Sequence, residues 1–272
     1  MTNILQLEHV TYAYDRERLA LDDVSLTIKK GERIAVIGNN GAGKSTFFLT
    51  CNGVLQPRSG EVLYSGEKIN HRKREDLSRL RRAVGIVFQD ADNQIIASTV
   101  PGEISFGPMN LGLSKEEVAQ RVEAAIDDMH LEAFRNRAPQ YLSGGEKKRV
   151  SIADILAMHP EIILFDEPTA SLDPQNSRLL EETLNRLSKT GITLVVSTHD
   201  MDLALRFADR VLVFSGGKLL CDATPEQVFQ NDALLAEAGL QKPTLFQVAQ
   251  MLGISSCPKD LQALQTELEK HQ

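Results

Sequence analysis

Apolar and polar residues follow two patterns in this chain, and each predicts a different kind of strand. Residues 4–10 and 24–28 alternate apolar with polar side chains, as half-exposed antiparallel strands do. Residues 33–37, 162–165 and 193–197 are almost continuously apolar, which is typical of parallel strands covered on both faces. The pattern therefore predicts a parallel sheet accompanied by antiparallel strands.

Helical periodicity replaces the strand patterns between about residues 90 and 160. Ser114 and Glu117 have the spacing of a capping box, and apolar residues then recur at helical spacing as far as Met129. A second helix is expected over residues 142–158, which return the chain to the core. We therefore expect an all-helical insertion in a sheet-based α/β core.

The last quarter of the chain combines a hairpin with helices. The pair Gly216-Gly217 separates two short apolar runs and predicts a tight β-hairpin. From Thr224 onward the pattern is helical. We expect a core domain over residues 1–222, with a helical subdomain at about 90–160, and a helical extension over residues 223–272.

Composition excludes several classes of protein. The 272 residues are 42% hydrophobic and 25% charged, as in ordinary globular domains. The formal net charge of -7 argues against a nucleic-acid partner, since phosphate backbones require clustered Lys and Arg. The first residues show no secretory signal, no window approaches the roughly 18 apolar residues of a membrane span, and the three cysteines fit no metal spacing. If the protein acts at a membrane, we expect another subunit to span it.

A glycine-rich segment lies between a predicted strand and a helix. Residues 38–45 read Gly-Asn-Asn-Gly-Ala-Gly-Lys-Ser and fit the phosphate-binding pattern GxxxxGK[ST] in its proper context. Such glycines let backbone N–H groups and the helix dipole face a phosphate. Lys44 would reach the β- and γ-phosphates, and the Ser45 hydroxyl would ligate Mg²⁺. The residues predicted to bind ATP here are Asn39, Asn40, Gly41, Ala42, Gly43, Lys44, Ser45 and Thr46.

Two adjacent carboxylates follow the apolar strand at residues 162–165. Asp166 has the position of a carboxylate that holds Mg²⁺ through water. Glu167 can accept a proton from an attacking water or hold that water in line. The alternative interpretation is that the pair only caps a helix.

The segment Leu-Ser-Gly-Gly-Glu at residues 142–146 predicts a second anion-binding helix N-terminus. Ser143 has the form of an N-cap, and Gly144 and Gly145 lack a Cβ atom. A plain capped helix is the alternative. One triphosphate cannot easily use this terminus and the glycine-rich loop of the same domain.

Together and in this order, these motifs resemble the nucleotide-binding subunits of ATP-binding-cassette (ABC) transporters, over about residues 4–221. The resemblance implies an α/β P-loop NTPase fold with an antiparallel β subdomain, an α-helical subdomain insertion and a short helical C-terminal extension. It also implies hydrolysis of ATP with Mg²⁺ in a head-to-tail dimer. There the signature Ser143, Gly144, Gly145 and Glu146 of one protomer closes on the γ-phosphate held by the other. Glu146 departs from the Gln that is common in the family.

The resemblance assigns further site residues. Gln89 matches the Q-loop glutamine near Mg²⁺, and His199 matches the switch histidine that contacts the γ-phosphate. Ser171 and Asp173 belong to the D-loop, which crosses the dimer interface. Tyr14 matches the aromatic residue that stacks on adenine, with Tyr12 as the rival, because residues on one strand face recur with period two.

Residues 92–100 and 106–113 closely resemble the ATPases of energy-coupling-factor importers, which take up vitamins or cobalt and nickel ions. That resemblance implies an integral membrane scaffold, a substrate-capture subunit, and a peripheral location on the cytoplasmic face of the membrane. The ATPase pair would be a homodimer or a heterodimer with a related ATPase. The sequence from Ala238 to Leu252 favours the cobalt or nickel branch. A vitamin-type importer, a non-transport ABC ATPase and an ATP-binding module without turnover stay as alternatives.

Overall fold

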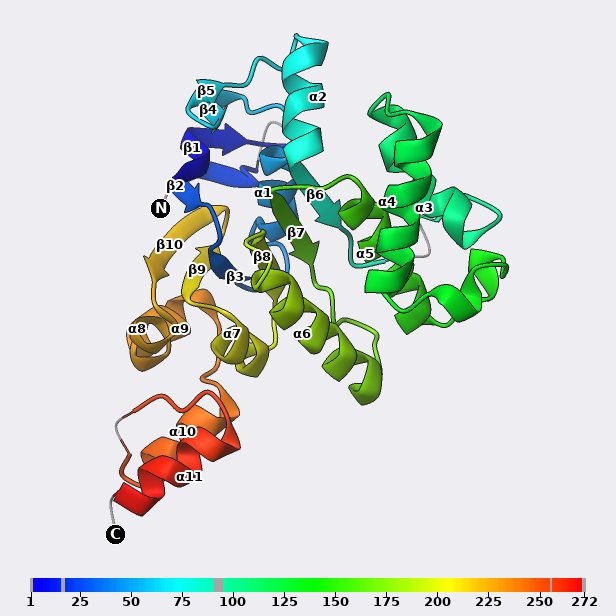
Figure 1. The fold of residues 1–272 in the computed structure, drawn as a ribbon. Coiled ribbons are helices and arrows are strands. Elements are labelled where there is room, and N and C mark those ends of the chain that lie inside the picture. The colour runs from blue at the N-terminus through cyan, green and yellow to red at the C-terminus, as the bar shows by residue number, and fades with distance from the viewer. Residues whose placement is uncertain (1, 16–17, 91–94, 255, 271–272) are drawn as a thin grey trace. The chain divides into compact units, whose positions relative to one another are not determined.

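The computed structural model describes residues 2–15, 18–90, 95–254 and 256–270, in two compact units. Residues 1–68 and 195–272 form the first unit, and residues 69–194 form the second. The elements are labelled in Figure 1. None of the helices in the described residues has the length and apolar character needed to cross a membrane.

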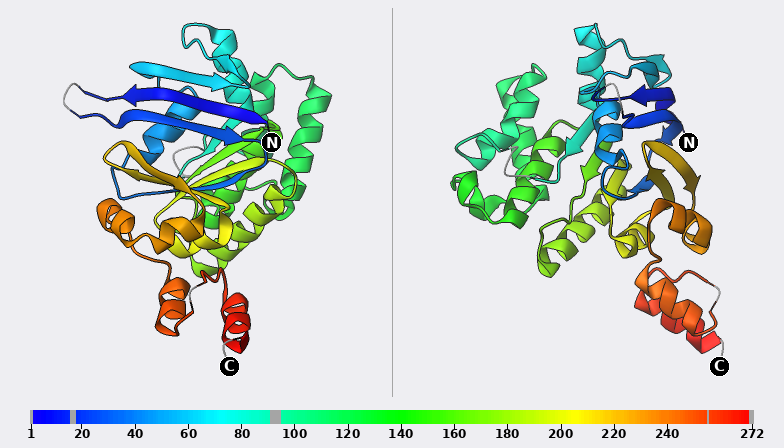
Figure 2. Two further views of the ribbon diagram at one scale, coloured as in Figure 1. Left: turned by 90° about the vertical axis from the view of Figure 1, so that its left-hand side faces the viewer. Right: turned by 180° about the vertical axis from the view of Figure 1, so that it is seen from behind.

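A four-stranded antiparallel sheet opens the first unit, with the strand order β2-β1-β4-β5. Its strands are β1 (Asn3–Tyr12), β2 (Leu21–Lys29), β4 (Ser59–Tyr64) and β5 (Glu67–Lys68). Leu5 pairs with Ile28 and Leu7 with Leu26, so apolar residues of the alternating pattern face one another. The left view of Figure 2 shows β1 and β2 side by side. The two predicted strands are confirmed, whereas β4 and β5 were not predicted.

The remaining strands of the first unit include the one that leads into the glycine-rich loop. This strand, β3 (Arg33–Ile37), is parallel to β9 (Arg210–Ser215), and β9 pairs antiparallel with β10 (Lys218–Ala223). Gly216 and Gly217 have φ values of 55° and 84°, as the predicted two-residue hairpin turn requires. The interior of β3 is buried, as its apolar run predicts.

Helices complete the first unit: α1 (Lys44–Cys51), α7 (Met201–Phe207), α8 (Pro225–Gln230), α9 (Asp232–Ala238), α10 (Thr244–Met251) and α11 (Leu261–Lys270). The predicted helical tail is confirmed. Helix α9 ends at Gly239, which has the left-handed conformation, and α10 begins after Pro243. Ala249, Ile254 and Leu264 form a small core of their own in the tail.

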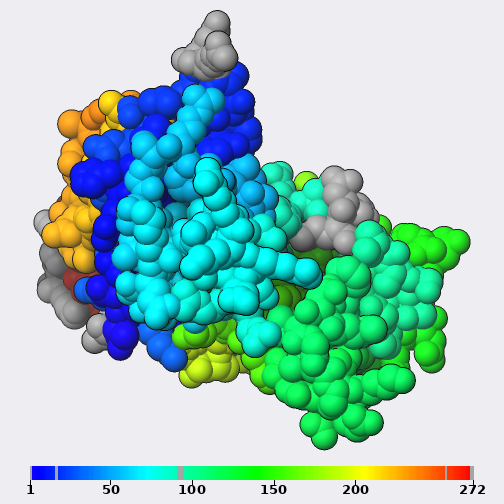
Figure 3. Space-filling view, turned by 90° about the horizontal axis from the view of Figure 1, so that it is seen from above, coloured from blue at the N-terminus to red at the C-terminus, as the bar shows by residue number. Residues whose placement is uncertain are grey.

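The second unit contains α2 (Arg74–Ala83), β6 (Val84–Val87), α3 (Val100–Asn110), α4 (Lys115–Asp128), α5 (Gly144–Ala157), β7 (Ile162–Asp166) and α6 (Pro174–Ser188). The parallel strands β6 and β7 pair from Val84 with Ile162 onward. The boundary between the two units falls within β8 (Thr193–Thr198). Helix α2, drawn in cyan, lies at the surface in Figure 3, and most of its polar residues are exposed.

The helical insertion is confirmed, because the described residues between 90 and 160 contain no strand. Its helices α3 and α4 both pack on α5. One detail differs from the prediction. Ser114 caps α4 by accepting from the backbone N–H of Glu117 at 3.1 Å, but the Glu117 carboxylate accepts from Arg121 at 2.8 Å. The ion pair with Arg121, one helical turn away, occupies the carboxylate that a full capping box would use.

Candidate functional site

The glycine-rich loop joins the buried end of β3 to the start of α1, and two of its glycines are required by space as well as by conformation. A Cβ at Gly38 would lie 2.3 Å from the carbonyl oxygen of Phe214. A Cβ at Gly43 would lie 2.5 Å from the carbonyl oxygen of Ala20. Both residues also have positive φ values, 154° and 108°. No other residue would allow the chain to pass here without displacing its neighbours.

The loop curls around the ammonium group of Lys44. This residue as a whole is only 7% exposed. Its Nζ donates to the carbonyl oxygens of Gly38 at 2.6 Å and Asn39 at 3.4 Å. The N-cap of α1 is Gly43, which has no side chain to satisfy the first N–H groups of the helix. These N–H groups and the adjacent Lys44 give the loop the positive character of an anion site.

Tyr14 and Tyr12, the two candidates for the adenine platform, differ in exposure. The Tyr14 side chain is 63% exposed, and its hydroxyl lies 3.3 Å from Oγ1 of Thr46, in the helix that follows the loop. Tyr12 is partly buried and packs edge-on against Tyr14, with ring centroids 5.0 Å apart. Tyr14 is therefore the ring with a free face beside the loop. In the same unit, His199 follows β8 and is exposed.

In the second unit, Asp166 and Glu167 lie at the end of β7, where both are buried. Glu167 has a φ of 45°, in the left-handed region that non-glycine residues rarely adopt. Such a backbone costs on the order of 1–3 kcal/mol and persists only where the surroundings impose it, often at functional sites. The Glu167 carbonyl accepts from the N–H of Ala170 at 3.1 Å, which closes the turn after the strand.

The signature segment begins helix α5 with a full capping box. The N–H of Glu146 donates to Ser143 Oγ at 3.3 Å, and the N–H of Ser143 donates to Glu146 Oε2 at 2.7 Å. Glu146 therefore performs the capping that a Gln would also perform at this position. Gly145 is required by packing, because a Cβ there would lie 2.2 Å from Oδ1 of Asn176.

Asn176 connects the signature helix to the D-loop. Asp173 caps α6 by accepting from the Asn176 N–H at 2.9 Å, and it also accepts from the Asn176 side chain at 2.6 Å. These hydrogen bonds lower the pKa of Asp173. The aspartate is therefore an ionised helix cap, and its partner asparagine packs directly on Gly145.

Three of the predicted segments meet around one cavity of about 260 Å³ in the second unit. Its walls come from the Q-loop, the signature helix and the D-loop: Gln89, Asp90, Gly144, Lys147, Lys148, Ala170, Ser171 and Leu172. The fold therefore brings Gln89, Gly144 and Ser171 together although they are far apart in the sequence.

Lys148 lines the same cavity and was not singled out from the sequence. Its side chain is buried, and Nζ donates to the carbonyl oxygens of Phe88 at 2.8 Å and Gln89 at 2.7 Å. Burial lowers its pKa to about 8, against the opposing effects of Asp90 and Asp166. Lys148 lies on the same face of α5 as the buried residues Gly145 and Ile152, and this helical spacing could have indicated that it points inward. The basic residues on either side of Lys148 made a solvent-exposed position look more natural.

The candidate metal ligands have the chemistry that Mg²⁺ prefers. Ser45, Gln89 and Asp166 all present oxygen atoms, and Mg²⁺ takes few protein ligands beside phosphate oxygens and water. Among the described residues, no group of three or more His, Cys, Asp or Glu side chains is placed to hold a metal ion. The donor set therefore fits a metal held together with a nucleotide better than a closed all-protein cage.

Comparison with known proteins agrees with these motifs. The ABC transporter family model matches residues 21–170. The energy-coupling factor ATP-binding protein EcfA of Methanothermobacter thermautotrophicus is 45% identical over 240 residues, covering 88% of this chain and 77% of that protein. The cobalt import ATP-binding protein CbiO of Rhodobacter capsulatus is 47% identical over 249 residues, covering 92% of this chain and 89% of that protein.

Solved structures show the same fold. The structure of cbiO1 from Clostridium perfringens, part of the transporter complex cbiONQ, has a TM-score of 0.78 at 35% identity, covering 93% of this chain and all of that one. The cassette MJ0796, as a post-hydrolysis dimer bound to ADP and Pi, has a TM-score of 0.73 at 34% identity, covering 82% of this chain and 99% of that one. The chain thus has the ABC ATPase fold with an antiparallel subdomain and helical segments, and it belongs to the ATP-hydrolysing subunits of the ABC transporter family.

Proposed function

We propose that this chain is the ATPase of an energy-coupling-factor importer that takes up cobalt or nickel ions through separate membrane subunits. The observation that carries the proposal is a complete set of ABC motifs in a chain 47% identical to a cobalt import ATPase. The described residues offer no cluster of metal-binding side chains of their own. Cargo selection therefore belongs to a partner, and this chain supplies the energy.

In the proposed site, residues 39–46 hold the phosphates of ATP and Tyr14 stacks on adenine. Ser45, Gln89 and Asp166 would hold Mg²⁺, which neutralises charge on the phosphate oxygens. Glu167 accepts the proton of the attacking water, and His199 contacts the γ-phosphate. Lys148 fixes the backbone of Gln89 through the hydrogen bonds described above.

The second half of each ATP site comes from another protomer in this proposal. The signature residues 143–146 close on the γ-phosphate held by the partner, and Ser171 and Asp173 lie at the interface between the protomers. The uncapped start of α1 and the N-terminus of α5 are then both used by one triphosphate. A homodimer is favoured because every motif is present in this chain.

A cavity of about 560 Å³ in the second unit is suited to a segment of the membrane scaffold. Phe106 of α3 lines it and is 57% exposed, and Asp154 of α5 lies in its wall. Among the described residues, nothing hydrogen-bonds to Asp154 Oδ1 although this atom is buried. The lining of the cavity includes four arginines, so an acidic segment of the scaffold would match its charge better than a cationic one. The predicted energy-coupling-factor segment includes Phe106, whereas Asp92, Asn93 and Gln94 of that segment lie outside the described residues.

Uptake in cells with and without the gene tests the proposal. Loss of radiolabelled cobalt or nickel uptake on deletion, with biotin, riboflavin and thiamine uptake unchanged, would support it. The opposite pattern would assign the chain to a vitamin-type importer, an alternative that also fits the relatives named only as energy-coupling-factor ATPases.

Fractionation separates transport from the non-transport alternative. A transporter ATPase co-purifies from membranes with integral proteins, and Phe106→Ala should reduce that recovery because it removes an exposed aromatic anchor. The matched control is Met109→Ala, at another exposed apolar residue of α3 that does not line the cavity. Equal recovery of membrane partners with both variants would remove the cavity from its proposed role.

A further inference from the structure

The link between α9 and α10, residues 239–243, begins in contact with the glycine-rich loop. Gly239 has φ 65° and ψ 34°, and the N–H of Leu240 donates to the carbonyl of Leu235 at 2.8 Å, which closes the end of α9. A Cβ at position 239 would lie 2.3 Å from Nδ2 of Asn39. The absence of a side chain therefore allows the Asn39 amide to lie directly on the link.

Beyond the link, α10 is fixed to the helix that follows His199. The N–H and the hydroxyl of Thr244 donate to the two carboxylate oxygens of Asp202, each at 2.9 Å. Asp202 lies in the first turn of α7, while the N-cap of α10 is Pro243, which provides no capping side chain. Asp202 thus caps α10 from another helix, and its negative charge suits a helix N-terminus.

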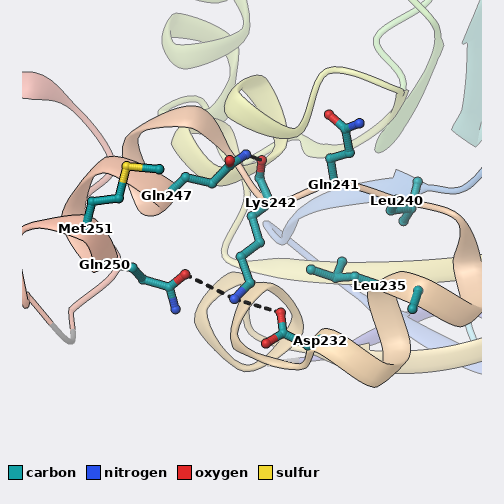
Figure 4. A pocket seen from close by; sticks show the side chains of 9 residues that line it. Asp232, Leu235, Leu240, Gln241, Lys242, Gln247, Gln250 and Met251 are labelled. Atoms are coloured by element: carbon teal, nitrogen blue, oxygen red, sulfur yellow. Dashed lines mark hydrogen bonds and ion pairs between the residues drawn. The ribbon is translucent and has the colours of Figure 1, made fainter.

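Polar contacts hold the link between these two ends (Figure 4). Lys242 Nζ lies 2.7 Å from Asp232 Oδ1 in α9 and 3.1 Å from Gln250 Oε1 in α10. The Lys242 carbonyl accepts from Gln247 Nε2 at 2.8 Å. The pocket of about 710 Å³ beside these residues is therefore spanned by Lys242, which bridges both helices.

Asn39 connects the link to the phosphate-binding groups. Its carbonyl oxygen accepts from the N–H of Ala42 at 3.1 Å and from Lys44 Nζ at 3.4 Å. A displacement of the Asn39 backbone would therefore move both the loop and the lysine that faces the phosphates, while the group that lies against Gly239 is the Asn39 side-chain amide. Contact with Gly239 limits where the Asn39 side chain can lie.

We propose that Gly239 is a positioning residue for the ATP site. Because it has no side chain, it leaves room for the Asn39 amide and so lets the glycine-rich loop keep the conformation that receives the phosphates. The C-terminal helices consequently influence ATP affinity, although none of their residues is proposed to contact the nucleotide. This inference rests on the proposed binding of ATP by residues 39–46.

The test is Gly239→Ala in the full-length protein, with Gly253→Ala as the matched control. Both glycines have left-handed backbones, at φ 65° and 74°, but a Cβ at Gly253 would meet nothing within 4 Å. We expect Gly239→Ala to weaken ATP binding and raise KM about tenfold with kcat at saturating ATP unchanged, and the control to change affinity by less than about twofold. Equal effects of the two substitutions would overturn the proposal.

A double-mutant cycle with Asn39→Ala shows whether the effect passes through Asn39. Once the Asn39 amide is absent, Gly239→Ala should cost no more affinity than Gly253→Ala does. The same tenfold loss in both backgrounds would refute positioning through Asn39. The wild-type protein separates this outcome from failure of the proposed function, because a wild-type chain that does not bind ATP would contradict the ATP site itself.

Discussion

At the scale of single residues, two of the residues proposed for the site have unusual backbone conformations. Glu167 has a positive φ immediately after a buried strand, and Ser171 of the D-loop has a φ of 65°. The left-handed backbone conformation is unfavourable for both residues, because each has a Cβ atom. Backbone strain of this kind persists only where the surrounding structure imposes it, and it is one observation behind the proposed role of Glu167.

Glu167→Gln should lower steady-state phosphate release by about 10²–10⁴-fold while ATP binding is retained, because an amide cannot accept the proton of the attacking water. The variant should also accumulate as an ATP-bound dimer. Lys44→Ala provides the contrast: it should weaken ATP binding itself, because it removes the ammonium group. Phosphate release and nucleotide binding on both variants measure this. Near-normal turnover of Glu167→Gln would exclude Glu167 as the base.

Individual site residues were predictable where a motif fixes their spacing and unpredictable where only tertiary contact reveals them. The glycines at 38 and 43 follow from the loop pattern, and the structure adds the neighbours that exclude a Cβ. Lys148 carries no such pattern, and its hydrogen bonds to Phe88 and Gln89 span about sixty residues of sequence. A buried lysine in a basic run looks like a solvated helix face until the fold is known.

At the scale of elements, the packing of α3 on α5 places two acids close together. Glu103 is buried and accepts from the N–H groups of Ile96 at 3.0 Å and Ala97 at 2.7 Å. Burial, with the nearby charge of Glu103, raises the pKa of Asp154 to about 7. Ionised Asp154 is therefore unfavourable in the folded chain.

This predicts a pH dependence of stability with a definite sign. The pKa of Asp154 is raised from 3.8 to about 7 in the folded state. The contribution of its carboxyl group to the free energy of unfolding is therefore fully present below pH 4, where the group is protonated in both states, and is lost as the pH rises through 7. Asp154→Asn should remove this loss and raise the free energy of unfolding at pH 8 by about 2–4 kcal/mol relative to wild type. Denaturant unfolding of both proteins at pH 5 and pH 8 measures it. An equal gain at both pH values would contradict the shifted pKa.

Elements with strong periodicity were predicted from the sequence, whereas short edge elements were not. The buried strand β3 has the predicted bounds, because its apolar run is continuous and ends in glycine. Strands β4 and β5 escaped prediction because residues 59–64 contain only three apolar side chains and β5 has only two residues. Strand β4 pairs with the distant strand β1, and β5 pairs with β4. These pairings stabilise the two strands more than the β-propensity of their own residues does.

At the scale of the whole molecule, the proposed dimer makes each ATP site composite. Mixing a Ser143→Arg chain with a Lys44→Ala chain gives a heterodimer in which one site keeps its own Lys44 and the partner protomer's Ser143. The other site carries both lesions. We expect phosphate release from the mixture to exceed that of either homodimer, because neither homodimer has an intact site.

Light scattering supplies a second measurement for the dimer. The Glu167→Gln chain should dimerise on addition of ATP, because bound triphosphate is then not consumed. A mixture no more active than its components, together with a Glu167→Gln chain that stays monomeric with ATP, would contradict the composite site.

In the proposed function, ATP hydrolysis by this chain powers metal uptake. The most direct measurement is radiolabelled cobalt uptake in cells lacking the gene and supplied with either wild-type protein or Glu167→Gln, at equal amounts in the membrane fraction. We predict that wild type restores uptake, whereas Glu167→Gln leaves it at the level of the deletion, with nickel as a second cargo. Full uptake with Glu167→Gln, or no dependence of either metal on the gene, would contradict the account.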